Sequence, residues 1–94
     1  MSAPLAYRPD AGCPCDIERG EFCYGDLVDG VPRWLHFWPH DSKCPLSAAI
    51  APHRNPIGAS WTLSGTREAP TLSPSVNAKR CWHGFLVDGV ARAC

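Results

Sequence analysis

Residues 21–38 read EFCYGDLVDGVPRWLHFW, and this stretch decides the fold class. Two runs rich in aromatic and β-branched residues flank Asp29-Gly30, a dipeptide that strongly favours a two-residue hairpin turn. A similar pattern returns at residues 84–92, GFLVDGVAR. We therefore expect two similar hairpins that bracket the domain, arising either by duplication or because one good hairpin solution occurs twice.

The chain between the hairpins favours strands over helices. Residues 59–63 alternate between small or polar and apolar side chains, and residues 71–76 are extended, with Pro74 typical of an edge or a bulge. Residues 45–51 fit either one helical turn or a strand. The 8 glycines and 10 prolines leave no long helical period. We predict a mainly β fold, a small antiparallel β domain of five or six strands at residues 21–94 after an irregular arm at residues 1–20.

Length and charge restrict the classes of function. The 94 residues suffice for one compact domain, and 9 basic against 9 acidic side chains give zero net charge. Zero net charge excludes the basic field of a protein that wraps nucleic acid, and it excludes an acidic DNA mimic. There is no apolar run of membrane-spanning length and no secretory signal at the start. We expect no membrane partner and a location in the cytoplasm of the bacterial host.

The hairpin turns also predict which side chains meet. A two-residue turn at Asp29-Gly30 places Cys23 opposite His36, and the same register at Asp88-Gly89 places His83 opposite Cys94. Side chains alternate between the two faces of a strand. Further members of these faces are therefore Trp34, Trp38, His40 and Cys81.

Six cysteines leave three alternatives open, and they are Cys13, Cys15, Cys23, Cys44, Cys81 and Cys94. They can form disulfides in any of about 15 pairings, bind a metal, or stay as small buried thiols. Zinc favours four Cys or His ligands in a tetrahedron. We expect a structural zinc held by His40, Cys44, His83 and Cys94, with His36, Cys23 and Cys81 as alternates. The competing interpretation is a cysteine-bearing apolar core without metal.

Residues 61–76 (WTLSGTREAPTLSPSV) and 81–89 (CWHGFLVDG) resemble a widespread family of small phage and prophage proteins. The shared pattern is Trp-x-x-x-Gly, then Pro-Thr-Leu-x-Pro-Ser, then Trp-His-Gly before an apolar strand. The resemblance covers residues 61–94, and residues 21–38 more loosely. It implies zinc binding, because many members carry a cysteine-rich knuckle before the tryptophan strand. Residues 36–44 depart from that knuckle.

This resemblance, together with the size and charge, suggests a non-enzymatic protein-binding module of a phage or prophage. Such a module would block a host protein, for example as an anti-CRISPR inhibitor of a defence system. Trp34 and Trp38 would be its partner-binding anchors if they are exposed, because exposed tryptophans often dominate interfaces. The competing interpretation places both in the core.

Three further functions stay open. One is a minor virion component. A second is a nucleic-acid-binding zinc module, which would use the basic side chains Arg67, Lys79, Arg80 and Arg92. The third is a metal- or thiol-dependent hydrolase built on Cys81 and His83, although no Gly-x-Ser-x-Gly or His-Glu-x-x-His motif is present.

Overall fold

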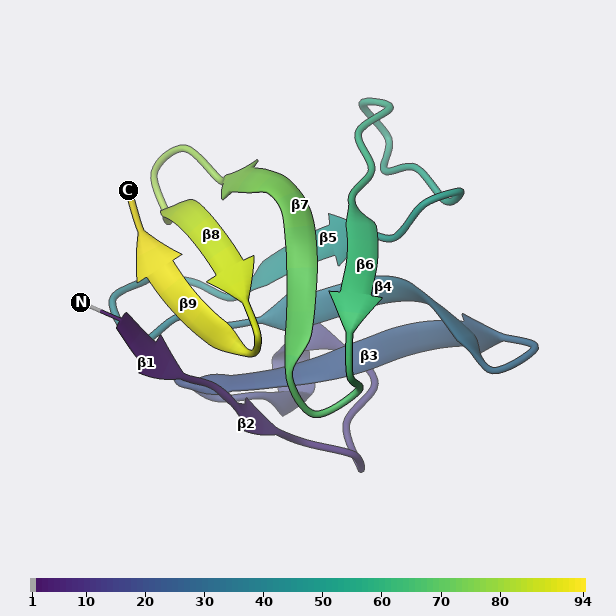
Figure 1. Cartoon of the computed structure of the whole chain (residues 1–94), viewed down its shortest axis with the longest axis horizontal. Helices are drawn as coiled ribbons and strands as arrows, with labels where there is room; N and C mark the ends of the chain where they lie inside the picture. The colour runs from purple at the N-terminus through teal and green to yellow at the C-terminus, as the bar shows by residue number, and fades with distance from the viewer. Residues whose placement is uncertain (1) are drawn as a thin grey trace.

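The computed structural model describes residues 2–94, which form nine strands in two sheets (Figure 1). The first sheet has the order β1-β9-β8-β7-β6, and the second has the order β2-β3-β4-β5. The first and last strands lie on the same side of the molecule, because β1 pairs with β9.

The first sheet is antiparallel throughout. A register shift between Leu72 and Val76 interrupts the pairing of β7 with β8. Its strands are β1 (Ser2–Pro4), β6 (Thr62–Gly65), β7 (Pro70–Asn77), β8 (His83–Val87) and β9 (Val90–Ala93).

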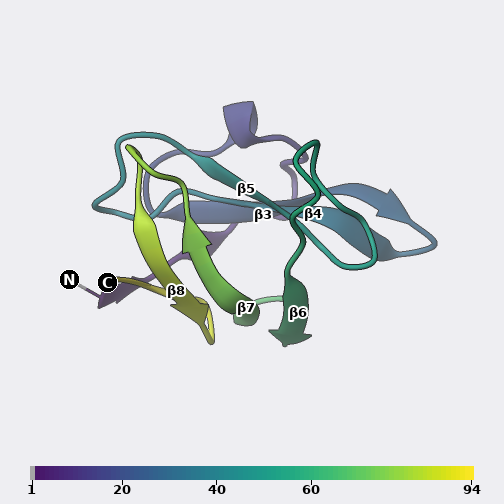
Figure 2. The same cartoon turned by 90° about the horizontal axis from the view of Figure 1, so that it is seen from above.

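The second sheet carries the long hairpin predicted from the sequence. Its strands are β2 (Ala6–Tyr7), β3 (Glu21–Val28), β4 (Val31–Phe37) and β5 (Leu46–Ala49). The pairing of β2 with β3 is parallel, and the other two pairings are antiparallel. A short 3-10 turn, η1 (Pro14–Asp16), lies on the side of this sheet that faces away from the first sheet (Figure 2).

Both Asp-Gly corners adopt the expected turn. Asp29 and Gly30 have φ of 54° and 78°, and Asp88 and Gly89 have φ of 50° and 76°. Positive φ at both central residues defines the type I′ turn, whose twist matches that of the flanking strands. The register of the first hairpin agrees with the prediction, since Cys23 lies opposite His36.

The core lies between the two sheets. Phe22, Leu35 and Phe37 of the second sheet and Leu86 of the first sheet are fully buried. Trp82, just before β8, is nearly fully buried. The rings of Phe37 and Trp82 meet edge to face at a centroid distance of 5.9 Å. Burial of such large apolar side chains stabilises a small domain by about 1.5–3 kcal/mol per residue.

The predicted fold class is confirmed, since the chain is mainly β and compact. The structure has nine strands, more than the five or six predicted. The residues expected in an irregular arm include β1 and β2, which join one sheet each. No helix among residues 2–94 has the length and apolar character needed to cross a membrane.

Four of the six cysteines form two disulfides. Cys44 is bonded to Cys81 across 37 residues, and Cys13 is bonded to Cys15. Cys23 is a buried free thiol, and Cys94 is free and exposed. The Cys44–Cys81 bond joins the segment before β5 to the turn before β8 and thus connects the two sheets.

Candidate active site

A serine and a histidine meet on the outer face of the second sheet. The Nδ1 atom of His36 on β4 lies 2.7 Å from the Oγ atom of Ser47 on β5. Within residues 2–94 this is the one hydrogen bond that joins a serine to a histidine side chain. His36 is only 7 % exposed, whereas Ser47 is exposed. An accessible hydroxyl that contacts a sheltered imidazole is the arrangement of a nucleophile and its general base.

The strand register brings these two side chains together. The backbone N–H of Ile50 donates to the carbonyl of Arg33 at 2.8 Å, so these opposite residues form a hydrogen-bonded pair. His36 lies opposite Ser47 three positions further along the same two strands. Hydrogen-bonded and non-hydrogen-bonded pairs alternate along antiparallel strands. His36 and Ser47 therefore form a non-hydrogen-bonded pair, whose Cα atoms approach to about 4.5 Å, closer than in the other kind.

Burial controls the protonation of His36. Desolvation lowers the pKa of this imidazole below its ordinary value of 6.5. The ring is consequently neutral at physiological pH, and a neutral ring can accept the Ser47 proton at Nδ1. The ring of Trp34 stacks on His36 with an interplanar angle of 11° and a centroid distance of 6.1 Å. This stacking restricts rotation of the imidazole.

The imidazole and the N-terminal arm both approach Gly25 of β3. A Cβ atom built on Gly25 of β3 would lie 2.6 Å from Nε2 of His36 and 2.8 Å from the carbonyl oxygen of Gly12. The arm and the imidazole thus approach the backbone of β3 too closely for any side chain at position 25. Glycine at this position allows His36 to sit where it does.

The free thiol nearest to this pair is unreactive. Cys23 lies directly opposite His36 in the register, is fully buried, and donates to the carbonyl of Cys13 at 3.6 Å. Burial raises the pKa of the Cys23 thiol to about 11. Because the thiolate is the reactive form of cysteine, this side chain is not a nucleophile at neutral pH.

Ser47 also belongs to the wall of a groove of about 450 Å³ between β5 and β7. That volume is within the range of small-molecule binding sites, about 300–1,000 Å³. None of the described residues that line this groove is charged. Its polar lining residues are Ser47, Asn55, Ser75 and Asn77, and apolar ones include Leu46, Ile57, Trp61 and Val76.

A second serine and a second histidine lie on the neighbouring strands β7 and β8 without a hydrogen bond between their side chains. Ser75 lines the same groove, and its carbonyl accepts a hydrogen bond from the indole N–H of Trp61 at 3.2 Å. His83 is exposed and lies opposite Asn77, two residues beyond Ser75 on β7. The described chain has no hydrogen bond between the side chains of Ser75 and His83.

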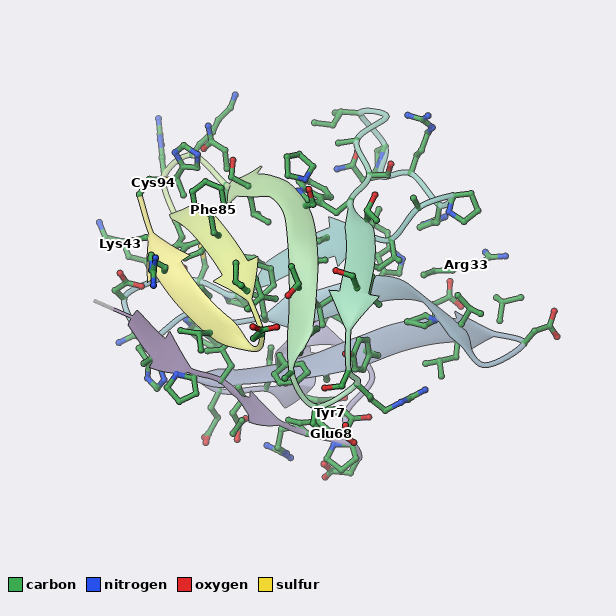
Figure 3. The ribbon with its side chains drawn as sticks, viewed as in Figure 1. Tyr7, Arg33, Lys43, Glu68, Phe85 and Cys94 are labelled. Atoms are coloured by element: carbon green, nitrogen blue, oxygen red, sulfur yellow. A yellow bond between two sulfur atoms is a disulfide. The ribbon has the colours of Figure 1, made fainter. Side chains whose placement is uncertain are left out.

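The residues expected to hold zinc do not gather at one place. Cys44 and Cys81 are bonded to each other, and the Nε2 atom of His40 lies 3.3 Å from the carbonyl oxygen of Pro4. His83 and Cys94 are neighbours as predicted, since the Cys94 N–H donates to the His83 carbonyl at 2.9 Å. Cys44 is therefore held in a disulfide, whereas Cys94 lies at the chain terminus (Figure 3).

One different group has the spacing of a metal site. The ligand atoms of Cys13, Cys15 and Asp16 lie within 4.8 Å of one another. Its two sulfur atoms are joined in a disulfide, however, and zinc binds thiolates. Zinc binding therefore stays a prediction, and this arrangement adds no support for it.

The expected partner-binding tryptophans are both half-buried. Trp34 lies between the rings of His36 and His53. The indole N–H of Trp38 donates to the carbonyl of Ser42 at 3.0 Å, and the guanidinium of Arg19 lies over its ring. Both rings have intramolecular partners, and Trp34 contacts the Ser–His pair.

The protein family follows from a comparison of the sequence with known families. Residues 11–94 match the family described as "Bacterial ubiquitination-like system serine protease (BubE)". The chain belongs to this family. No curated protein and no solved structure matches it.

Family membership overturns two sequence-based expectations. The prediction of a non-enzymatic phage module that inhibits a host defence system, including its anti-CRISPR form, is wrong, because the matching family is one of bacterial proteases. The expectation that the chain is not an enzyme is wrong for the same reason. A thiol-dependent hydrolase at Cys81 is also unsupported, since Cys81 is oxidised. The resemblance to a phage and prophage family remains a prediction.

The hairpin register predicts the face of His36 correctly, but it gives no indication that Ser47 is its partner. Serine-protease motifs are local, whereas this pair joins two strands and depends on their register. A usable signal was present, because residues 45–51 were compatible with a strand. An antiparallel strand there brings a hydroxyl within reach of the β4 face.

Proposed function

We propose that this chain is a serine protease of a bacterial ubiquitination-like system, with Ser47 as the nucleophile and His36 as the general base. The observation that carries the proposal is the 2.7 Å contact between Oγ and Nδ1. Membership of a family described as serine proteases supports the same chemistry. The exposed serine is accessible to a substrate, and the buried imidazole is neutral and held by Trp34.

The first half-reaction forms an ester. The Ser47 Oγ atom attacks the carbonyl carbon of the scissile amide while its proton moves to Nδ1 of His36. The resulting tetrahedral intermediate collapses when the C–N bond breaks, and His36 donates the same proton to the departing nitrogen. The products of this step are a free amine and an acyl group bonded to Ser47.

The second half-reaction releases the acyl group. His36 is neutral again and takes a proton from a water molecule, whose oxygen attacks the ester carbonyl. When the bond to Oγ breaks, His36 returns the proton to Ser47. The product is a carboxylic acid, and both side chains regain their starting protonation.

The catalytic unit is a dyad. His36 has no hydrogen bond to a carboxylate within residues 2–94. Two features hold the ring in place of an acid, namely the stacked indole of Trp34 and the close approach of the β3 backbone at Gly25. Dyads without an acid are known variants of the serine-protease arrangement.

A fluorophosphonate probe, which forms a covalent bond with activated serines, tests this proposal without a known substrate. We expect the full chain to be labelled, Ser47→Ala to lose the label, and His36→Ala to react about 10²–10⁴-fold more slowly. Ser64→Ala is the matched control, because Ser64 is exposed on β6. It should react like the unmodified chain.

Retention of full labelling by a folded Ser47→Ala protein would overturn the proposal. Loss of labelling on Ser75→Ala, with Ser47→Ala unaffected, would move the nucleophile to β7. Circular dichroism of each variant shows whether the β structure is retained.

A further inference from the structure

We infer that the open edge of β5 at Ser47 binds the backbone of an extended, uncharged substrate segment within the groove between β5 and β7. The inference rests on the proposed function, because it names the class of substrate that the Ser47–His36 pair would cleave. It concerns main-chain atoms and the groove residues other than the Ser47 side chain, none of which takes part in the proton transfers.

The backbone of Ser47 points away from its own sheet. Since His36 and Ser47 form a non-hydrogen-bonded pair, the N–H and C=O of Ser47 face the side opposite β4. Two residues further along the edge, the carbonyl of Ala49 already accepts a hydrogen bond from the N–H of Trp61 at 2.8 Å. The described chain supplies no such partner for the N–H or C=O of Ser47.

An unpaired donor and acceptor on one edge residue form a docking position for another strand. A substrate residue in extended conformation can exchange both backbone hydrogen bonds with Ser47, as in a hydrogen-bonded antiparallel pair. Pro45 lies two residues before Ser47, and proline at a strand edge leaves no unpaired N–H at that position. The docking position is therefore centred on Ser47.

The groove beside this edge selects against charge. Among residues 2–94, no acidic, basic or histidine side chain lines it, so a charged substrate residue would lose hydration without gaining a partner. Its two asparagines present donors. The Asn55 Oδ1 atom accepts the N–H groups of Ile57 and Ala59, and the Asn77 Oδ1 atom accepts the N–H of Lys79. The amide nitrogens are thus left to bind carbonyl oxygens.

These features describe a flexible segment and not a folded surface. Pairing with a strand edge requires an extended backbone with free N–H and C=O groups, which folded domains use internally. The substrate class is accordingly a protein tail or linker with small or apolar, uncharged side chains at the cleavage position.

Binding to an inactive protein tests the inference separately from catalysis. Ser47→Ala keeps the backbone of residue 47, whereas Ser47→Pro removes its N–H and breaks no hydrogen bond to β4. The probe is a fluorescent acetylated heptapeptide of alternating alanine and valine, measured by anisotropy. We expect it to bind Ser47→Ala and to bind Ser47→Pro about 10-fold more weakly, with both proteins folded by circular dichroism.

Modified peptides give a second readout on Ser47→Ala. N-methylation at successive peptide positions should weaken binding at alternate positions, since only every second residue of a strand faces its neighbour. Three lysines or three aspartates in the centre should weaken binding at least about 10-fold. No binding of any peptide, a uniform effect of N-methylation, or equal binding of the charged peptides would overturn the inference. Binding with this pattern, but no fluorophosphonate labelling of the unmodified chain, would instead overturn the proposed function.

Discussion

Substitution of Gly25 by alanine should displace the catalytic base without changing either member of the dyad. The new Cβ atom would lie 2.6 Å from Nε2 of His36, whereas ordinary van der Waals contact begins at 3.4 Å. The imidazole must therefore move by about 0.8 Å, unless β3 moves instead. A misplacement of about 1 Å in a catalytic group costs about 10²-fold in rate. We expect Gly25→Ala to react with the fluorophosphonate probe about 10²-fold more slowly than the unmodified chain.

The matched control is Gly12→Ala. A Cβ atom at Gly12 would have no neighbour within 4 Å, so this variant should react within about twofold of the unmodified chain. Overpacking at Gly25 should also lower the free energy of unfolding by about 1–3 kcal/mol, which urea denaturation measures. A folded Gly25→Ala protein that is labelled as fast as the unmodified chain would show that Gly25 does not position His36.

Three further predictions concern pH, the disulfides and the stacked tryptophan. The labelling rate should rise with pH to a plateau, with a midpoint below pH 6.5, because burial lowers the pKa of His36. Only the neutral ring accepts a proton. A midpoint at or above pH 6.5 would contradict this prediction. The unfolded chain binds that proton more readily, so stability measured by denaturation should fall as the pH drops below 6.5. Replacing Cys44 and Cys81 with serine should lower the free energy of unfolding by about 4 kcal/mol, because their bond closes a loop across 37 residues. Replacing Cys13 and Cys15 should lower it much less, since their loop is short. Equal losses would argue against the loop-closure explanation. Trp34→Ala should slow labelling about 10-fold while Ser47 stays reactive, because the imidazole loses its stacked neighbour, and an unchanged rate would show that the stacking does not position His36.

Local chemistry explains why the hairpins were predictable. Asp29-Gly30 and Asp88-Gly89 favour one turn type, and that turn sets every pair along its two strands. The position of Cys23 opposite His36 followed from this rule alone. The strand at Ser2–Pro4 was not predicted, because its pairing with β9 joins opposite ends of the chain and leaves no local signal.

The residues predicted to hold zinc lie apart for a related physical reason. Residue type and spacing identify possible ligands, but a metal needs their atoms in one place, which depends on how the two sheets pack. Packing brings Cys44 to Cys81, while His40 contacts the β1 strand. The cysteines were candidates for zinc, for disulfides or for free thiols, and the chain contains both disulfides and free thiols.

Only one member of the dyad could be predicted from the sequence. His36 could be placed from its hairpin, but Ser47 lies on β5, a strand of four residues that the sequence did not separate from a helical turn. Short apolar segments carry little periodicity, so their structure is decided by tertiary pairing. The enzymatic function was missed together with this strand.

The identity of the labelled serine tests the central claim most directly. The unmodified chain would be treated with the fluorophosphonate probe, digested, and its modified peptide sequenced by mass spectrometry. The proposed chemistry predicts a single adduct on Ser47, formed at a rate that depends on His36. An adduct on Ser75 or on any other serine, or the absence of an adduct on the folded protein, would contradict it.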